Sequence, residues 1–180
     1  MSRILTPKAI LSYPHLYDPV AAEDGGEAKY SCCLVFEPGT DLSELEKAAM
    51  EVGRAKWGDK LEGYLKTKKV RWPIRNDENE KYGEGCRFVN VRSATRPTVV
   101  DGSLRVIDES RSSEVYPGCV VVASVSAFAY EGKTNTGISF GLGNIQKVSD
   151  GKRLDGRKDA ADEFEVIPGS ELEFAAAELI

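Results

Sequence analysis

The chain has 180 residues, of which 41% are apolar and 29% are charged, and its formal net charge is −5. This size suits one domain with a genuine core, and no run approaches the ~20 apolar residues of a membrane-spanning helix. The N-terminal segment contains Pro7 and Pro14 and lacks the apolar stretch of a signal peptide, so we expect an intracellular, cytoplasmic protein with no membrane partner.

The first third of the chain predicts two strands and one helix. Ile4–Tyr17 reads as a strand that ends in an aromatic cluster, and Ala28–Phe36 reads as a second strand after a polar turn. Asp41, with Glu44 three residues later, is typical of a helix start, and apolar residues follow at helical spacing until Gly58. A further short helical turn is expected at Lys60–Leu65.

The segment 64–96 combines positive charge with aromatic rings. Residues 66–96 carry nine Lys and Arg against four Asp and Glu, although the whole chain is acidic. Grooves that bind single-stranded nucleic acid combine cations for the phosphates with flat rings on which bases stack. The candidate nucleic-acid-binding residues are Lys66, Lys68, Lys69, Arg71, Trp72, Arg75, Tyr82, Arg87, Phe88, Arg92 and Arg96, with Tyr116 further along the chain.

The pattern leaves the binding face open. In a strand from Cys86 to Val91, Arg87 and Phe88 point to opposite sides, so either side could face the nucleic acid. The alternative reading is that Trp72 and Phe88 belong to the core and that the lysines only solvate the surface.

The hairpin from Gly118 to Val148 organises the fold. Small apolar residues occupy alternate positions of its first strand, and a polar loop at Glu131–Thr136 leads into the second strand. The second strand has Ile138 and its apolar partners on one face and three glycines on the other, a pattern that marks sharp bending or close approach of another group. Before this hairpin, Thr98–Val100 and Leu104–Ile107 predict short extended pieces joined by a turn at Asp101-Gly102. We expect a mainly β fold, with one main helix and a five-stranded OB-like barrel that has long inserted loops.

The C-terminal end is acidic. Residues 159–180 carry seven Asp and Glu and no Lys or Arg, which is typical of a mobile interaction tail. A docked terminal helix at Ser170–Leu179 is the alternative, and both states are compatible with the sequence. We therefore divide the chain into a domain at residues 1–158 and an acidic tail at residues 159–180.

The sequence contains no pattern for a metal, a cofactor or an enzyme. The four cysteines, Cys32, Cys33, Cys86 and Cys119, form no CxxC pair and are expected to be reduced and buried. The acidic run 77–80 lacks the glycine and the spaced ligands of a calcium loop and is expected to be a solvated turn. The lone His15 has no partner for a catalytic triad that the sequence reveals.

Five stretches together resemble a known family. The order YPHLY, KYSCCLVF, WPIRN with KYGEGCRFVN, YPGCVVVASVSAFAY and GISFGLGNIQKVSDG is similar to a family of tailed-phage single-stranded-DNA-binding proteins, first catalogued as a domain of unknown function. The resemblance covers about residues 3–165, and its most specific parts are Tyr116-Pro117-Gly118 and Gly137–Val148.

The resemblance implies a five-stranded OB-type barrel, binding to single strands without sequence preference, and an acidic tail that contacts replication partners. Two features depart from the family pattern. Tails in related phage proteins end in an aromatic residue, whereas this chain ends in Glu178-Leu179-Ile180. Many OB barrels also place their helix after the third strand, whereas the predicted helix here follows the second.

We therefore expect a non-enzymatic protein that coats single-stranded DNA during phage replication or recombination. Its expected partners are single-stranded DNA, phage replication or recombination proteins that meet the tail, and a second copy of the chain in a homodimer. The alternative is a phage virion or assembly protein, a β module whose tail docks on another subunit. That alternative gives no reason for the segment of arginines and aromatic residues.

Overall fold

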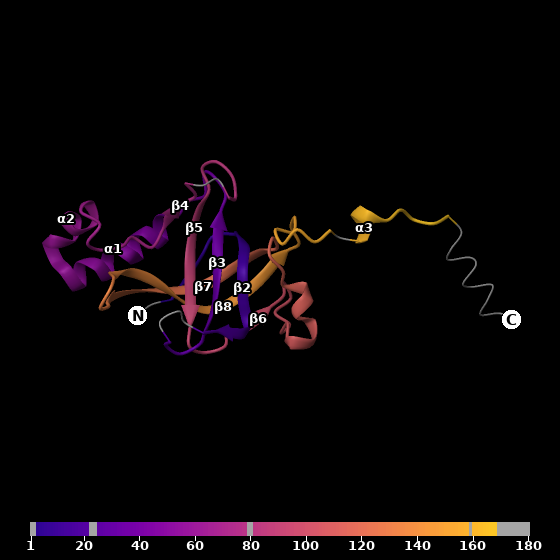
Figure 1. Cartoon of the computed structure of the whole chain (residues 1–180), viewed down its shortest axis with the longest axis horizontal. Coiled ribbons are helices and arrows are strands. Elements are labelled where there is room, and N and C mark those ends of the chain that lie inside the picture. The colour runs from indigo at the N-terminus through magenta and orange to yellow at the C-terminus, as the bar shows by residue number, and fades with distance from the viewer. Residues whose placement is uncertain (1–2, 22–24, 79–80, 159, 169–180) are drawn as a thin grey trace.

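The structure is a computed structural model that describes residues 3–21, 25–78, 81–158 and 160–168. Five long strands form a closed ring in which every neighbouring pair is antiparallel except β5 and β8, which are parallel. Around the ring the order is β2-β3-β5-β8-β7 and back to β2 (Figure 1). The five strands are β2 (Ala9–Val20), β3 (Lys29–Phe36), β5 (Arg87–Ser93), β7 (Val120–Glu131) and β8 (Thr136–Ser149). The predicted mainly β fold, with five strands in a closed arrangement, is confirmed.

Three short strands extend the ring: β1 (Ile4–Leu5) pairs with β7, β4 (Arg75–Asn76) pairs with β5, and β6 (Val99–Val100) pairs with β8. The prediction of one strand over Ile4–Tyr17 was wrong, because the regular pairing with β7 is interrupted between β1 and β2. Pro7 has no N–H to donate at this break. Thr6 spans it, since its N–H donates to the Ala123 carbonyl at 2.9 Å and its hydroxyl accepts from the Ala123 N–H at 3.0 Å.

The interior of the ring is filled from alternate positions of the strands. In β7 the buried residues are the small set that the alternation predicts, from Val121 to Ala127, and in β8 Ile138, Phe140 and Leu142 are buried opposite them. A register shift in the β7–β8 pairing between Ala123 and Val125 then changes which residues of β8 face inward. As a result Ile145, three positions after Leu142, is also buried. Small side chains on β7 leave room inside a narrow ring for the larger ones of its neighbour.

The main helix lies at one end of the ring, beside the tip of the β7–β8 hairpin (Figure 1). It is α1 (Ser43–Trp57), followed by a short 3₁₀ turn and α2 (Leu61–Lys66), as the sequence predicts. The helix begins one residue later than predicted, with Leu42 as its N-cap, and Asp41 accepts a hydrogen bond from the Ser43 N–H at 3.0 Å. The helix follows the second long strand of the ring, as expected.

Two features fix the position of these helices. A Cβ atom on Gly53 would lie 2.8 Å from Leu61 and 2.9 Å from Ile138, so glycine lets α2 and β8 approach α1 closely. The Trp57 indole N–H donates to the Glu131 carboxylate at 3.3 Å, which ties the helix end to the hairpin tip.

The chain leaves the ring after the turn that follows β8. Leu154 donates its N–H to the Pro117 carbonyl at 2.9 Å. The short helix α3 (Ala160–Glu163) and the residues up to 168 extend away from the ring (Figure 1). The expected terminal helix at Ser170–Leu179 lies outside the described residues. Within the described part, no helix is long and apolar enough to cross a membrane.

Candidate nucleic-acid interface

A groove of about 560 Å³ lies on the outer surface where β5, β8 and β7 meet the segment 71–75. It is lined by residues from five parts of the chain that are distant in sequence. Among the described residues, its walls contain four cations, three aromatic rings, several small polar residues and no carboxylate: Lys29, Arg71, Trp72, Pro73, Arg75, Asn90, Arg92, Ser93, Ala94, Phe128, Tyr130, Asn135, Ile138 and Ser139.

The cations of the groove are Lys29, Arg71, Arg75 and Arg92, and all four are exposed. None of them forms an ion pair with a carboxylate in the described part of the chain. Cations that line a concave surface without nearby acids produce a positive potential that attracts an anionic ligand. We refer to these four residues as the groove cations.

Two rings stand on the outward face of β7. Phe128 and Tyr130 alternate with the buried positions of that strand and are each half-buried. Their ring centroids are 6.3 Å apart, with 52° between the ring planes. Trp72, the third ring, packs partly against the core. The two β7 rings therefore offer aromatic surface to a ligand, while Trp72 also supports the wall.

Gly137 and Ser139 of β8 are paired with these two rings. In the β7–β8 pairing, Phe128 is opposite Ser139 and Tyr130 is opposite Gly137. A Cβ atom on Gly137 would lie 2.9 Å from Arg71 and from the Tyr130 hydroxyl. The close approach that the glycine pattern predicts is therefore real at this position, and the approaching group is the wall of the groove itself.

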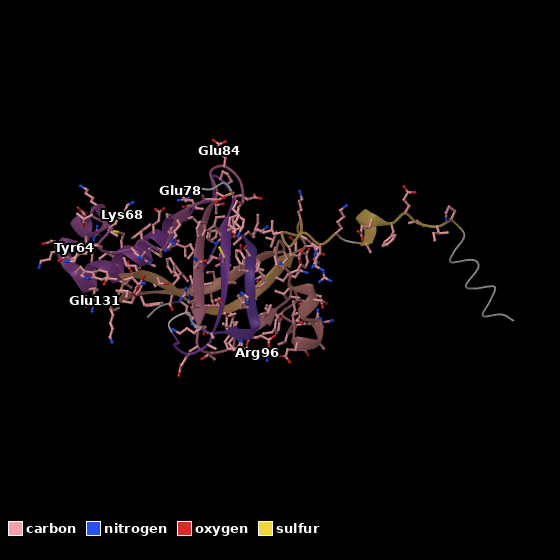
Figure 2. All side chains as sticks on the ribbon, viewed as in Figure 1. Tyr64, Lys68, Glu78, Glu84, Arg96 and Glu131 are labelled. Carbon is pink, nitrogen blue, oxygen red and sulfur yellow. The ribbon has the colours of Figure 1, made fainter. Side chains whose placement is uncertain are left out.

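Three predicted lysines lie outside the groove, at the end of α2 and in the turn that leads from it to Arg71. Lys66, Lys68 and Lys69 are all exposed, and Figure 2 shows Lys68 and Tyr64 at the same end of the molecule. The Lys69 ammonium lies 4.4 Å from the centroid of the Tyr64 ring. These residues extend the positive surface from the groove cations toward α2.

Tyr82 and Phe88 are half-buried and pack against a small cluster formed by Cys33, Val35 and Cys86. The Tyr82 hydroxyl is hydrogen-bonded to the Ser12 hydroxyl at 2.8 Å. Burial raises the pKa of Tyr82, and burial also raises the pKa of the Cys33 thiol to about 11. Neither ring lines the groove, although Arg75, which does, pairs with Phe88 across β4 and β5.

Arg87, Arg96 and Tyr116 also lie outside the groove. Arg87 is 3.3 Å from the Glu46 carboxylate and donates to the Thr40 carbonyl at 2.9 Å. Arg96 is 3.2 Å from the Glu109 carboxylate, and Figure 2 shows it at the end of the molecule opposite Glu84.

Tyr116 belongs to a structural corner. Its hydroxyl donates to the Asp150 carboxylate at 3.1 Å and accepts from the Gly151 N–H at 3.0 Å. The Lys147 ammonium and the Arg153 guanidinium lie 5.4 and 4.6 Å from the centroid of its ring. The Tyr116-Pro117-Gly118 motif thus locks the start of β7 to the turn after β8.

The described residues contain no group of three His, Cys, Asp or Glu side chains that could hold a metal ion.

The expected turn at 77–80 is present as far as it is described. The Asp77 carboxylate accepts from the backbone N–H groups of Lys81, Tyr82 and Gly83, at 3.1, 2.6 and 3.3 Å. Residues 79 and 80 lie outside the described part.

All four cysteines are free and buried, as expected.

A protein-family model built around the single-stranded-DNA-binding protein of Enterobacter phage Enc34 matches residues 2–175. The chain belongs to this family. The family is one of DNA-binding proteins and not of enzymes. No curated protein sequence matches the chain.

Solved structures of the Enc34 family and of a second phage protein share the fold. The Enc34 protein in complex with single-stranded DNA superposes with a TM-score of 0.69 at 24% identity, over 84% of this chain and 88% of that one. The Enc34 protein alone gives 0.68 at 24% identity, over 91% and 90% of the two chains. The single-stranded-DNA-binding protein gp2.5 of bacteriophage T7 gives 0.63 at 13% identity, over 93% and 99%.

The sequence patterns predicted some of the residues that line the groove and missed others. Arg71, Trp72, Arg75 and Arg92 were predicted, whereas Lys29, Asn90, Phe128 and Tyr130 were not. A signal for the two rings was present in the sequence. Phe128 and Tyr130 have the opposite parity to the small buried residues of β7, so the alternation that predicts the core also places both rings outside.

Proposed function

We propose that this protein binds single-stranded DNA in the groove, without sequence preference, and coats it during phage replication or recombination. One observation carries the proposal: four cations with no paired carboxylate in the described residues share one groove with two outward rings. Membership of a family of single-stranded-DNA-binding proteins supports it. Such a role would be carried out on phage DNA in the host cytoplasm.

Each type of residue has a distinct role in this proposal. The groove cations contact successive phosphates, and Phe128 and Tyr130 stack on bases that are not paired. Stacking contributes about 1–3 kcal/mol per base and accepts every base, because each has a flat face. A duplex hides those faces inside the helix, so the rings give the preference for single strands.

The remaining predicted residues divide into two groups under this proposal. Lys66, Lys68 and Lys69 attract the strand as it leaves the groove beside Arg71, through long-range electrostatic attraction. Tyr82, Arg87, Phe88, Arg96 and Tyr116 act by holding the surrounding strands and loops in place.

The acidic tail at residues 159–180 is the second part of the proposal. Seven carboxylates tethered to a domain with a positive groove compete with DNA at a high effective concentration. The same segment contacts replication or recombination proteins, and two copies of the chain associate as a homodimer. The domain that binds DNA ends near residue 158.

Fluorescence anisotropy with labelled single-stranded and double-stranded oligonucleotides of equal length tests the main proposal. We expect tighter binding to the single strand. The double variant Phe128→Ala and Tyr130→Ala should lose about tenfold or more in affinity for it, from the loss of one or two stacked bases.

Lys47→Gln is the matched control, because Lys47 is an exposed cation of α1 outside the groove. It should bind like the unchanged chain. Equal affinity for single and double strands, or a double variant that binds normally, would contradict the proposal. A complete lack of binding would favour the virion or assembly role instead.

A further inference from the structure

Tyr13 has a backbone conformation that tyrosine rarely adopts. Its φ is +45°, in the left-handed region where any side chain with a Cβ atom is strained. The pairing of β2 with β3 shifts register between Ser12 and His15, so Tyr13 lies in a bulge. A bulge redirects a side chain from the regular alternation. The Tyr13 side chain is 55% exposed, so packing in the core does not explain why a tyrosine occupies this position.

A cation lies directly on this exposed ring. The Lys81 ammonium is 4.0 Å from the centroid of the Tyr13 ring and 5.6 Å from that of Tyr82. Tyr82 is held in place, because its N–H donates to the Asp77 carboxylate at 2.6 Å and its hydroxyl is bonded to Ser12. The Lys81 N–H also donates to the Asp77 carboxylate, at 3.1 Å. Hydrogen bonds to Asp77 and Ser12 therefore hold the Lys81 backbone and Tyr82 beside the Tyr13 ring.

A row of side chains connects this pair to the groove across the outer faces of three strands. Tyr82 meets Phe88 edge to face, with ring centroids 6.3 Å apart and 60° between the planes. Phe88 in β5 lies opposite Arg75 in the pairing of β4 with β5, and Arg75 is one of the groove cations. Along this side of the ring, β3, β5 and β8 lie between β2 and β7, a path of four strand spacings or about 19 Å. Tyr13 and the two β7 rings belong to the strands at the two ends of this path, although β2 and β7 also pair directly at Ala9 and Ile10.

We infer that Tyr13 and Lys81 form a second stacking position for the same DNA strand. A base stacks on the Tyr13 ring, and the Lys81 ammonium contacts the adjacent phosphate. The inference rests on the proposed function, and it extends the contact surface from the groove across β5 and β3 to β2.

The acidic residues of the nearby loop are compatible with this position. The Asp77 carboxylate is occupied by three backbone N–H groups. Figure 2 shows Glu78 and Glu84 at the outer end of this loop, with Glu84 pointing away from the ring of strands. Among the described residues, the Lys81 ammonium forms no ion pair with a carboxylate.

The experiment compares a short and a long strand, because only a long strand reaches both positions. Affinities are measured for oligothymidylates of about 2 and about 20 nucleotides, which bracket the usual 4–16 nucleotides bound per OB-type domain; the shorter one is too short to span about 19 Å. Tyr13→Gly removes the ring and suits the positive φ, so this variant is expected to fold at least as well. Lys81→Gln removes only the charge, and Lys47→Gln is the charge control.

We expect Tyr13→Gly to weaken binding of the long strand about tenfold and to change binding of the short strand less than about twofold. Lys81→Gln should weaken only the long strand, by about threefold. Unchanged affinity of Tyr13→Gly for the long strand would overturn the inference, as would an equal loss for both lengths. The double variant of Phe128 and Tyr130 should weaken both lengths, so normal binding of that variant would overturn the proposed function separately.

Discussion

The backbone of Arg71 lies directly against Gly137. The Arg71 N–H donates to the Thr136 carbonyl at 2.9 Å, and the Arg71 carbonyl accepts from the Ile138 N–H at 3.0 Å. These two bonds join the segment 71–75 to β8 and make it a wall of the groove. They also place Arg71 beside Tyr130, so one glycine controls the position of a cation and of a ring.

Gly137→Ala should therefore affect both stability and DNA binding. The added methyl group would overlap the Arg71 backbone and the Tyr130 hydroxyl, and overpacking of this kind costs about 1–3 kcal/mol. We expect a lower melting temperature and weaker binding of single-stranded DNA, measured by circular dichroism and by anisotropy.

Gly63→Ala is the control for this prediction. A Cβ atom on Gly63, within α2, would have no heavy atom within 4 Å, so alanine should stabilise the helix by about 0.5–1 kcal/mol. DNA binding should not change. If Gly137→Ala bound and melted like Gly63→Ala, the contact between Arg71 and Gly137 would be unimportant.

Salt should weaken binding in proportion to the number of phosphates contacted. The four groove cations predict a slope near −3 in a plot of log affinity against log salt concentration, from about −0.7 per contact on a single strand. Titrations at several sodium chloride concentrations measure this slope. Binding that does not depend on salt would contradict contact between these cations and phosphates.

Arg75 and Arg87 lie close together in sequence but should respond in opposite ways to substitution. Arg75→Ala removes a groove cation that forms no ion pair among the described residues, so it should reduce the salt slope by about 0.7 and change stability by less than about 0.5 kcal/mol. Arg87→Ala removes the bonds to Glu46 and Thr40 and should lower stability by about 0.5–1 kcal/mol. Affinity and chemical unfolding are measured on both variants, and the reverse pattern would show that Arg87 contacts the DNA.

Deletion of residues 159–180 should tighten DNA binding at low salt. The deletion removes the seven carboxylates that we propose compete for the groove cations, and the difference should shrink as salt screens both interactions. Affinity is measured for the full and the shortened chain at low and high salt. Unchanged affinity at low salt would exclude competition by the tail but would leave its contact with partner proteins possible.

Stability should fall at alkaline pH because of Cys33. Burial, the largest cause, raises the pKa of this thiol from 9.0 to about 11, while its hydrogen bond with Tyr82 lowers the pKa and Asp77 raises it. Above about pH 9 the unfolded chain releases the thiol proton and the folded chain keeps it, so the free energy of unfolding decreases between about pH 9 and 11. The decrease from this group is at most about 3 kcal/mol.

Urea unfolding at pH 7.5 and at pH 10 measures this effect in the unchanged chain and in Cys33→Ala. The variant should lose less stability between the two pH values, because the other titrating groups are common to both proteins. An equal loss in both proteins would show that the Cys33 thiol ionises normally in the folded state.

The sequence determined the elements that depend on local patterns. Alternation in 119–129 predicted β7 and its buried face, and helical spacing from Leu42 to Val52 predicted α1, because burial of one face follows directly from the period of the backbone. The charge excess in 66–96 also predicted three of the four groove cations, since Arg71, Arg75 and Arg92 lie within one segment of the sequence.

Only the tertiary structure decided which of these residues act together. Lys29, Arg92 and Phe128 come from three strands, and closure of the ring, which depends on the pairing of all five long strands, brings them to one groove. The structure likewise assigned Arg87 to an ion pair with Glu46, because that contact joins a strand to a helix 41 residues earlier. Local patterns record the period of each element, whereas a groove depends on long-range pairing that no single segment of the sequence contains.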